Sequence, residues 1–256
     1  MKTKTKYGPI EPAKPRFEPR GLLIIPHRNE PLTVSSFRPN IYLNNLQEMQ
    51  GNFSCLPEYP QVSFRPATTS ESISAAVYEF EKRAKPQILD AQWLQLGWGV
   101  KTSEGVFVNP PKYSQGNPII NEKTLKSLLD KAKEVNGIYL ADNDFGFAPY
   151  ETFKQGYQDS VDFAEGGLAR VLEHTEDKTS ENLRNISSPQ FYVNGVHVWG
   201  FSSVKEPVLI VPALDSGWYV DDHWLCVVGY RGDGWGGCAF GVKKAGEASR
   251  AENKLY

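Results

Sequence analysis

The sequence predicts an α+β fold, in which a helical first half packs against an antiparallel β half. Amphipathic helical patterns lie mostly before residue 175, and β-favouring runs separated by turn residues dominate after residue 185. Helices that precede the strands favour a segregated α+β architecture over an alternating α/β one. With 256 residues, of which 40% are hydrophobic, the chain can bury a sizeable core.

We expect a single domain over residues 21–256, preceded by an extended arm over residues 1–20. The arm holds six Lys or Arg residues, two Glu and four Pro, a composition that favours polyproline II structure. The helical half is expected over about residues 60–175 and the β half over about residues 185–250.

The clearest helix signal covers about residues 69–84. Thr68 and Glu71 have the spacing of a capping box. Ile73, Val77 and Phe80 then follow at helical spacing, so they share one face. Further helices are predicted at residues 89–96, at residues 122–135 with a stop at Asn136-Gly137, and at residues 160–173.

Strands are predicted from short apolar, β-branched or aromatic runs. These runs lie at residues 22–25, 105–108, 138–140, 207–211 and 218–220. Asn194-Gly195 predicts a tight hairpin between residues 191–193 and 196–199. A second hairpin is predicted over residues 223–244, with a glycine-rich turn at residues 231–237.

Composition and motifs exclude several function classes. A net charge of −2 argues against a dedicated nucleic-acid binder. No apolar run reaches about 18 residues, and the first 20 residues lack an apolar signal core, so we expect a cytoplasmic protein without a membrane segment. No metal or cofactor is expected, because the cysteines lack CxxC spacing, Asp142 and Asp144 lack the remaining ligands of a calcium loop, and no phosphate-binding glycine loop is present.

Several segments between residues 62 and 244 carry a more specific signal through their order. They are Ile73–Val77, Leu89–Leu94, Asn136–Ile138 with Ala148–Tyr150, Pro207–Val211 and His223–Tyr230. In this order they resemble segments of the papain-like cysteine peptidases, whose histidine begins a strand reading roughly His-Ala-Val-x-x-Val-Gly-Tyr. Here that strand reads His-Trp-Leu-Cys-Val-Val-Gly-Tyr. The resemblance implies a papain-like fold, with a central helix packed on an antiparallel β half, and action on peptide bonds through a nucleophile–histidine pair.

The resemblance also implies roles for individual residues. His223 would be the base, and Ser70 stands where the family has its cysteine. Gln50–Cys55 is similar to the family's Gln-Gly-x-Cys-Gly-Ser-Cys, one residue shorter, which offers Cys55 as an alternative nucleophile and Gln50 as the oxyanion donor. Lys244 stands at the position of the family's orienting Asn, which departs from the pattern.

Three hypotheses follow. The first is a papain-like peptidase or amidase that uses Cys55 or Ser70 with His223. The second is a catalytically inactive relative that binds a peptide or protein partner, because the positions needed for chemistry read Ser70 and Lys244. The third is an unrelated α+β structural or assembly protein, with the arm and the aromatic β segments as interface material.

Overall fold

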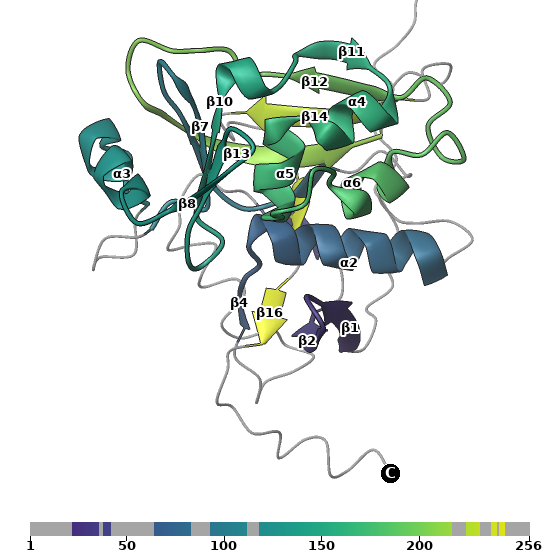
Figure 1. Ribbon diagram of the computed structural model, residues 1–256. Coiled ribbons are helices and arrows are strands. Elements are labelled where there is room, and N and C mark those ends of the chain that lie inside the picture. Colours follow the sequence, from purple (N-terminus) through teal and green to yellow (C-terminus); the bar gives the residue numbers. More distant parts are fainter. Residues whose placement is uncertain are drawn as a thin grey trace, which may run out of the picture.

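The structure is a computed structural model that describes residues 22–35, 38–41, 64–82, 93–111, 118–216, 224–230, 237–239 and 241–243. It confirms a mixed α+β fold, with helices and two sheets (Figure 1). The described helices are α2 (Thr69–Lys82), α3 (Glu122–Leu129), α4 (Ser160–Glu165), α5 (Gly167–Glu173) and α6 (Glu181–Ile186), with a 3-10 turn at Tyr150–Thr152.

The larger sheet runs through the whole body of the molecule in the order β11-β12-β14-β13-β6-β7-β10-β9-β8. Its strands are β6 (Gly99–Lys101), β7 (Gly105–Val108), β8 (Lys133–Val135), β9 (Ile138–Leu140), β10 (Gly146–Pro149), β11 (Gly156–Gln158), β12 (Val196–Trp199), β13 (Val208–Asp215) and β14 (Leu225–Tyr230). Along this path β12 and β14 pair in parallel and the other neighbours are antiparallel. The strands β3 (Arg38–Ile41), β5 (Trp93–Gln95) and β15 (Gly237–Ala239) extend from β13 off this path.

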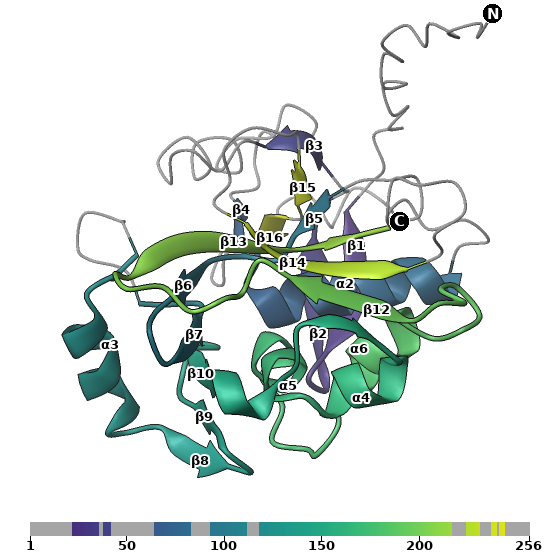
Figure 2. The same ribbon diagram turned by 90° about the horizontal axis from the view of Figure 1, so that it is seen from above.

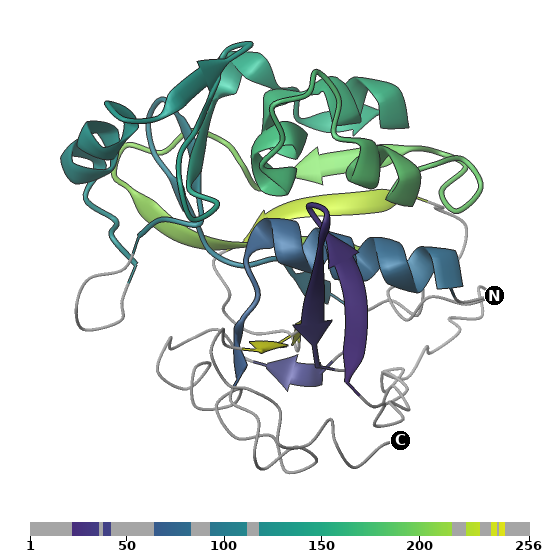
Figure 3. The same cartoon turned by 60° about the horizontal axis from the view of Figure 1, so that its bottom comes forward.

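The smaller sheet joins segments from both ends of the described chain. Its order is β1 (Leu23–His27), β2 (Glu30–Val34), β16 (Gly241–Lys243) and β4 (Phe64–Pro66). The β1–β2 hairpin lies across α2, as Figure 3 shows. This placement brings the tip of the hairpin to the first turns of the helix.

The main core lies between the helices and one face of the sheet. Alternate residues of β12 and β14, namely Val196, Val198, Leu225 and Val227, are at most 1% exposed and pack in the same cluster as Ile73 of α2. Seen from above, α4, α5 and α6 lie on one side of these strands, and β3, β5 and β15 lie on the other (Figure 2). The strands are therefore apolar on the face that the helices cover.

Helix α2 confirms the predicted first helix and its capping box. The Thr68 backbone N–H donates to Glu71 Oε2 at 2.8 Å, and the Glu71 N–H donates to Thr68 Oγ1 at 3.3 Å. The two reciprocal bonds satisfy N–H groups that the first helical turn would otherwise leave unpaired. Strands β1, β7, β9 and β13 confirm four further strand predictions. The helix predicted over residues 160–173 is present as two helices, α4 and α5, and the strand predicted at residues 218–220 lies outside the described residues.

The predicted helix over residues 122–135 is too long. Helix α3 ends at Leu129, and residues 133–135 form β8. Asn136 and Gly137, expected to stop a helix, instead form the turn between β8 and β9, with φ of +49° and +81°. Positive φ at both central residues is the geometry of a type I′ hairpin turn, which Asn-Gly favours strongly.

Two hairpin predictions are wrong. Residues 191–193 form no strand, and β12 pairs instead with β11 and β14. Strands β14 and β15 do not pair with each other; β14 pairs with β12 and β13, whereas β15 pairs with β3 and β5. Local turn signals are not decisive here, because strand pairing depends on segments that are distant in the sequence. The short helix predicted at residues 89–96 is also wrong where it is described, because Trp93–Gln95 is strand β5.

Candidate functional site

A buried polar cluster surrounds the start of α2, with the carboxylate of Asp144 at its centre. Asp144 Oδ2 accepts from Ser70 Oγ at 2.8 Å and from Thr68 Oγ1 at 2.5 Å. Asp144 Oδ1 pairs with Arg28 Nη1 at 2.6 Å. The Ser70 and Asp144 residues are 2% and 7% exposed. One carboxylate therefore joins the hairpin tip, the helix start and the turn between β9 and β10.

Unusual backbone conformations bring these side chains together. Asp144 has φ of +62° in the β9–β10 turn, and Arg28 has φ of +46° at the tip of the β1–β2 hairpin. Left-handed backbone is uncommon for residues other than glycine, although Asp tolerates it better than most. Since both residues adopt it where they pair, the contact has a local conformational cost that the ion pair offsets.

A second carboxylate lies at the same helix end. Glu71, which is 6% exposed, accepts two hydrogen bonds from Arg65, at 2.7 Å and 2.6 Å. This fork geometry is the strongest form of an arginine–carboxylate pair. Glu71 also closes the capping box, so its charge is held near the positive end of the helix dipole.

Asn109 fixes the first residue of the helix from the side of the sheet. Its Oδ1 accepts from the Thr69 backbone N–H at 3.3 Å, and its Nδ2 donates to Thr69 Oγ1 at 2.8 Å. Nδ2 also lies 3.1 Å from the backbone oxygen of Asp144. Asn109 follows β7 with φ of +49°. The helix start, β7 and the Asp144 turn are thus bonded to one another.

Charges in the cluster are set by this environment. Burial alone would raise the pKa of Asp144, but the hydrogen bonds from Thr68 and Ser70 and the charge on Arg28 outweigh it and lower the pKa below its usual value. Burial opposes ionisation of Glu71 as well, and Arg65 reverses that effect and lowers its pKa. Both carboxylates are therefore ionised at neutral pH.

Two histidines border the cluster without acting on Ser70. His27 Nδ1 lies 2.9 Å from Ser74 Oγ, one helical turn further along α2. His174 ends α5 in a left-handed conformation and hydrogen-bonds to the backbone of Asp144. Burial is the main reason that the pKa values of both rings are lowered, so both are neutral at pH 7. In the described part of the chain, the hydrogen-bond partner of His27 is Ser74 and that of His174 is the Asp144 backbone, and neither ring is bonded to the Ser70 hydroxyl.

The geometry does not equip Ser70 for attack on a substrate. Its hydroxyl is buried and donates to an ionised carboxylate whose lowered pKa makes it a weak base. The Thr69 and Glu71 N–H groups, which could form an oxyanion hole, are bonded to Asn109 and Thr68. The arrangement instead holds the hairpin tip, the helix and the sheet in one position.

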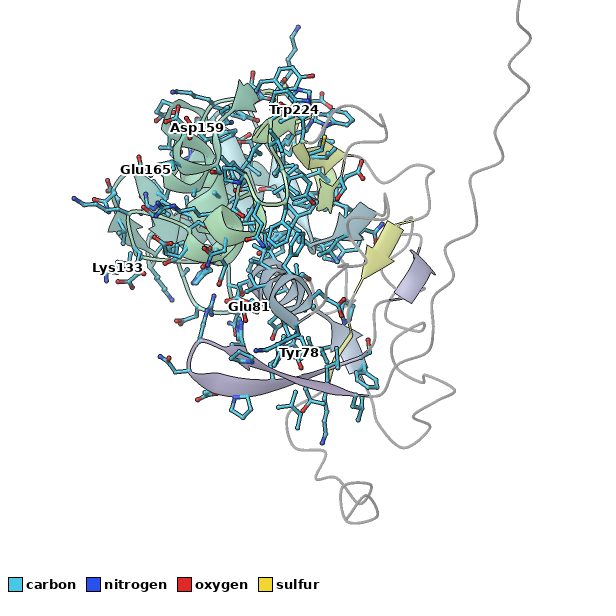
Figure 4. The ribbon with its side chains drawn as sticks, turned by 90° about the vertical axis from the view of Figure 1, so that its right-hand side faces the viewer. Tyr78, Glu81, Lys133, Asp159, Glu165 and Trp224 are labelled. Carbon is cyan, nitrogen blue, oxygen red and sulfur yellow. The ribbon has the colours of Figure 1, made fainter. Side chains whose placement is uncertain are left out.

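Gln50, Cys55, His223 and Lys244 lie outside the described residues. The described residue next to His223 is Trp224, which precedes β14. Figure 4 shows Trp224 near the top of the view, with Tyr78 and Glu81 of α2 lower in the body.

The start of β14 lies nearer the far end of α2 than its beginning. Phe80 packs against Tyr192, with 6.3 Å between ring centroids, and Tyr192 Oη lies 2.7 Å from Ser216 Oγ, just after β13. Cys226 of β14 pairs with Asp215 of β13. Because Phe80 follows Ser70 by ten residues, this region lies about 15 Å along the helix axis from Ser70.

Sequence reasoning missed the central role of Asp144 and its arginine partner. The Asp142-Asn143-Asp144 run suggests only part of a metal ligand set. Within the residues that the structure describes, no group of three or more His, Cys, Asp or Glu side chains could hold a metal ion. A buried aspartate in a tight turn has no local signal that predicts its arginine partner 116 residues away.

A pocket of about 430 Å³ lies beside the second half of α2. Its residues come from α2 and from α6 with the segment that follows: Val77, Phe80, Glu81, Asn185, Ile186, Ser188, Gln190 and Phe191. Phe80 and Phe191 meet edge to face, with centroids 4.7 Å apart. The lining is mixed, because Val77 and Phe191 are partly exposed apolar side chains, whereas Glu81, Asn185, Ser188 and Gln190 are polar. It suits an apolar side chain next to a basic one.

Comparisons with known proteins add no relative. No family model, curated protein or solved structure matches the chain. None of the described helices is both long and apolar enough to cross a membrane.

Proposed function

We propose that this chain is a catalytically inactive, papain-like protein that binds a polypeptide partner without cleaving it. The observation that carries the proposal is the state of Ser70, which stands where the resemblance expects the nucleophile. Its hydroxyl is 2% exposed and donates to the Asp144 carboxylate at 2.8 Å. A hydroxyl in this state is neither accessible nor activated.

The surroundings of α2 support the same proposal. Glu71 adds a second negative charge at the helix end where a thiolate or an oxyanion would have to form. Asp144 and Glu71 each pair with an arginine, so the negative charges at this end of the helix are already neutralised. We infer that this end of the helix stabilises the fold.

Binding is assigned to the pocket beside the second half of α2. Phe191, which packs on the buried Phe80, would contact an apolar side chain of the partner, and the exposed Glu81 would pair with a neighbouring Lys or Arg. A volume of about 430 Å³ suits one or two side chains of a peptide. The proposed ligand is therefore a peptide segment with a basic residue next to an apolar one.

A peptide array followed by fluorescence anisotropy tests the binding. We expect selected peptides to carry a basic residue beside an apolar one. Phe191→Ala should weaken them about tenfold or more, because it removes an aromatic contact from the pocket. Ile120→Ala, which removes an exposed apolar side chain elsewhere, is the matched control and should leave affinity unchanged.

The competing proposal is a peptidase that uses Cys55 or Ser70 with His223. It predicts peptide hydrolysis that is lost in His223→Ala and in one of Cys55→Ala or Ser70→Ala. Hydrolysis with this dependence would overturn the binding proposal. Selective binding that persists in all three variants, without cleavage, would support it.

A further inference from the structure

Exposed apolar side chains gather around β11, at one end of the larger sheet. Of the five large hydrophobic side chains that are exposed in the described part, three lie here: Tyr157 at 64%, Val161 at 40% and Val193 at 72%. Val161 is in the first turn of α4, directly after β11, and Val193 is in the turn before β12. Exposed apolar side chains concentrated at one place mark an interaction surface.

Three aromatic rings pack against one another on this surface, namely those of Tyr157, His197 and Trp224. We call these rings, together with Val161 and Val193, the β11 patch. Tyr157 stacks on His197, with centroids 4.0 Å apart and an angle of 20° between the ring planes. Trp224 packs against Tyr157 with centroids 4.4 Å apart. Tyr157 and His197 are cross-strand partners, so the sheet holds their rings in place.

Three acidic residues follow β11 directly in the sequence. Asp159 follows β11 directly and caps α4, and Asp162 and Glu165 are on that helix. Figure 4 labels Asp159 and Glu165 on the same side of the molecule as Trp224. Lys154 pairs with Asp162 at 3.3 Å. These three carboxylates and this ammonium together carry a charge of −2 in the described part of the chain.

We propose that the β11 patch binds residues 1–20 of the same chain. Those residues contain six Lys or Arg and two Glu, which gives a charge of +4, together with four Pro and the aromatic Tyr7 and Phe17. Proline-rich segments bind to aromatic surfaces because their extended conformation is already ordered and loses little entropy. The opposite charges of the two parts add electrostatic attraction.

The length of residues 1–20 allows the contact. In polyproline II conformation, 20 residues span about 60 Å. A compact chain of this size has a diameter of roughly 45–50 Å. A path over the surface is longer than this diameter, about 70–80 Å for half the circumference, so the first residues of the segment can reach most of the surface beyond the β1–β2 hairpin, toward the side where Trp224 lies (Figure 4). The proposal does not depend on the pocket beside α2.

Carbodiimide cross-linking of the full-length chain tests the proposal, because the reagent joins a lysine amine to a carboxylate without a spacer. We expect Lys2, Lys4 and Lys6, which are far enough along the segment to reach the β11 patch, to couple preferentially to Asp159, Asp162 or Glu165 within the monomer. Tyr157→Ser should reduce these cross-links roughly five-fold, whereas Tyr157→Phe should retain them. Ile120→Ser removes an exposed apolar side chain elsewhere and is the matched control.

Three results would overturn the proposal. They are cross-links spread evenly over the carboxylates of the surface, cross-links to α4 that are unchanged in Tyr157→Ser, and cross-links found only in a dimer. The last result would assign the β11 patch to a second copy of the chain. The wild-type cross-link map decides the first and third results even if Tyr157→Ser fails to fold.

Discussion

At the scale of single residues, Asp144 explains how the start of α2 is held. It accepts hydrogen bonds from Ser70 and Thr68 and pairs with Arg28, and it is 7% exposed. A buried charge with several partners contributes stability mainly because the partners would be left unsatisfied without it.

Replacing Asp144 with Asn should therefore destabilise the fold. The change removes the charge that pairs with Arg28 and leaves two buried hydroxyls with a weaker or misdirected acceptor. We expect a loss of about 2–3 kcal/mol in the free energy of unfolding, since Arg28 is partly exposed and its share is reduced by solvent. Urea unfolding measures it. Asp142→Asn changes an exposed carboxylate in the same turn and should cost less than about 0.5 kcal/mol.

The lowered pKa values of Asp144 and Glu71 predict a loss of stability in acid. A carboxyl group with a lower pKa in the folded state binds fewer protons there than in the unfolded state. Its contribution is therefore complete above the unfolded values of 3.8 and 4.5, and it is lost as the pH falls through the folded pKa. In Asp144→Asn the decline of the unfolding free energy below about pH 4.5 should be shallower.

Asp215 predicts the opposite pH dependence. Burial raises the pKa of this residue to about 6 from 3.8, and within the described chain its Oδ1 has no hydrogen-bond partner. Its contribution is complete below pH 3.8 and is lost as the pH rises through about 6. Asp215→Asn should therefore stabilise the protein more at pH 7.5 than at pH 4, as measured by thermal unfolding at both values. An equal effect at both pH values would contradict this.

At the scale of elements, two adjacent glycines divide the predicted helix over residues 160–173 into α4 and α5. Gly166 has φ of −65° and ψ of 145°, an extended conformation that ends α4. A Cβ at Gly167 would lie 2.1 Å from Thr152 Oγ1 and 2.9 Å from Ile138 Cγ2. The glycine at residue 167 is therefore required by the close approach of the helix to the 3-10 turn and β9.

Substitution by alanine should change the free energy of unfolding by different amounts at the two glycines. Gly167→Ala should destabilise the protein by about 2 kcal/mol, because overpacking outweighs the roughly 1 kcal/mol that helix propensity alone would add. Gly166→Ala is the matched change, since its Cβ would lie no closer than 3.1 Å to another atom and should cost much less. Equal unfolding free energies for the two variants would contradict the packing argument.

The order of strands also predicts that Cys226 and Cys238 do not form a disulfide within the folded chain. Strand β15 pairs with β5, β5 with β13, and β13 with β14, so three interstrand spacings separate the two cysteines. At about 4.8 Å each, these spacings total about 14 Å, beyond the Cα separation of a disulfide. Peptide mapping after mild oxidation should find no Cys226–Cys238 bond within the folded chain. Such a bond in a monomer with native stability would refute the strand order.

These elements show which parts of the fold the sequence predicts. The helix α2 was predictable because its cap, its apolar face and its length agree. Asn136-Gly137 and Asn194-Gly195 have identical letters, yet the first makes a tight hairpin turn and the second does not. Their flanking segments choose partners across the whole sheet, and long-range pairing has no local signal. The Arg28–Asp144 pair was unpredictable for the same reason.

At the scale of the whole molecule, strands from both halves of the chain share one sheet. Residues 93–158 contribute β5 to β11, and residues 196–239 contribute β12 to β15. Helices α2, α4, α5 and α6 pack in the core that this sheet forms. The start of α2 is bonded to β1, β7 and the β9–β10 turn, whereas its second half borders an open pocket. We therefore expect stabilisation at one end of the helix and binding at the other.

The most direct test of this account measures binding and cleavage in the same sample. Peptides with a basic residue beside an apolar one are incubated with the wild-type protein and with the Ser70→Ala, Cys55→Ala, His223→Ala and Phe191→Ala variants. Bound peptide is followed by anisotropy and its integrity by mass spectrometry. The account predicts intact peptide throughout, with binding weakened about tenfold or more only in Phe191→Ala. Peptide cleavage by the wild-type protein that disappears in His223→Ala would contradict it.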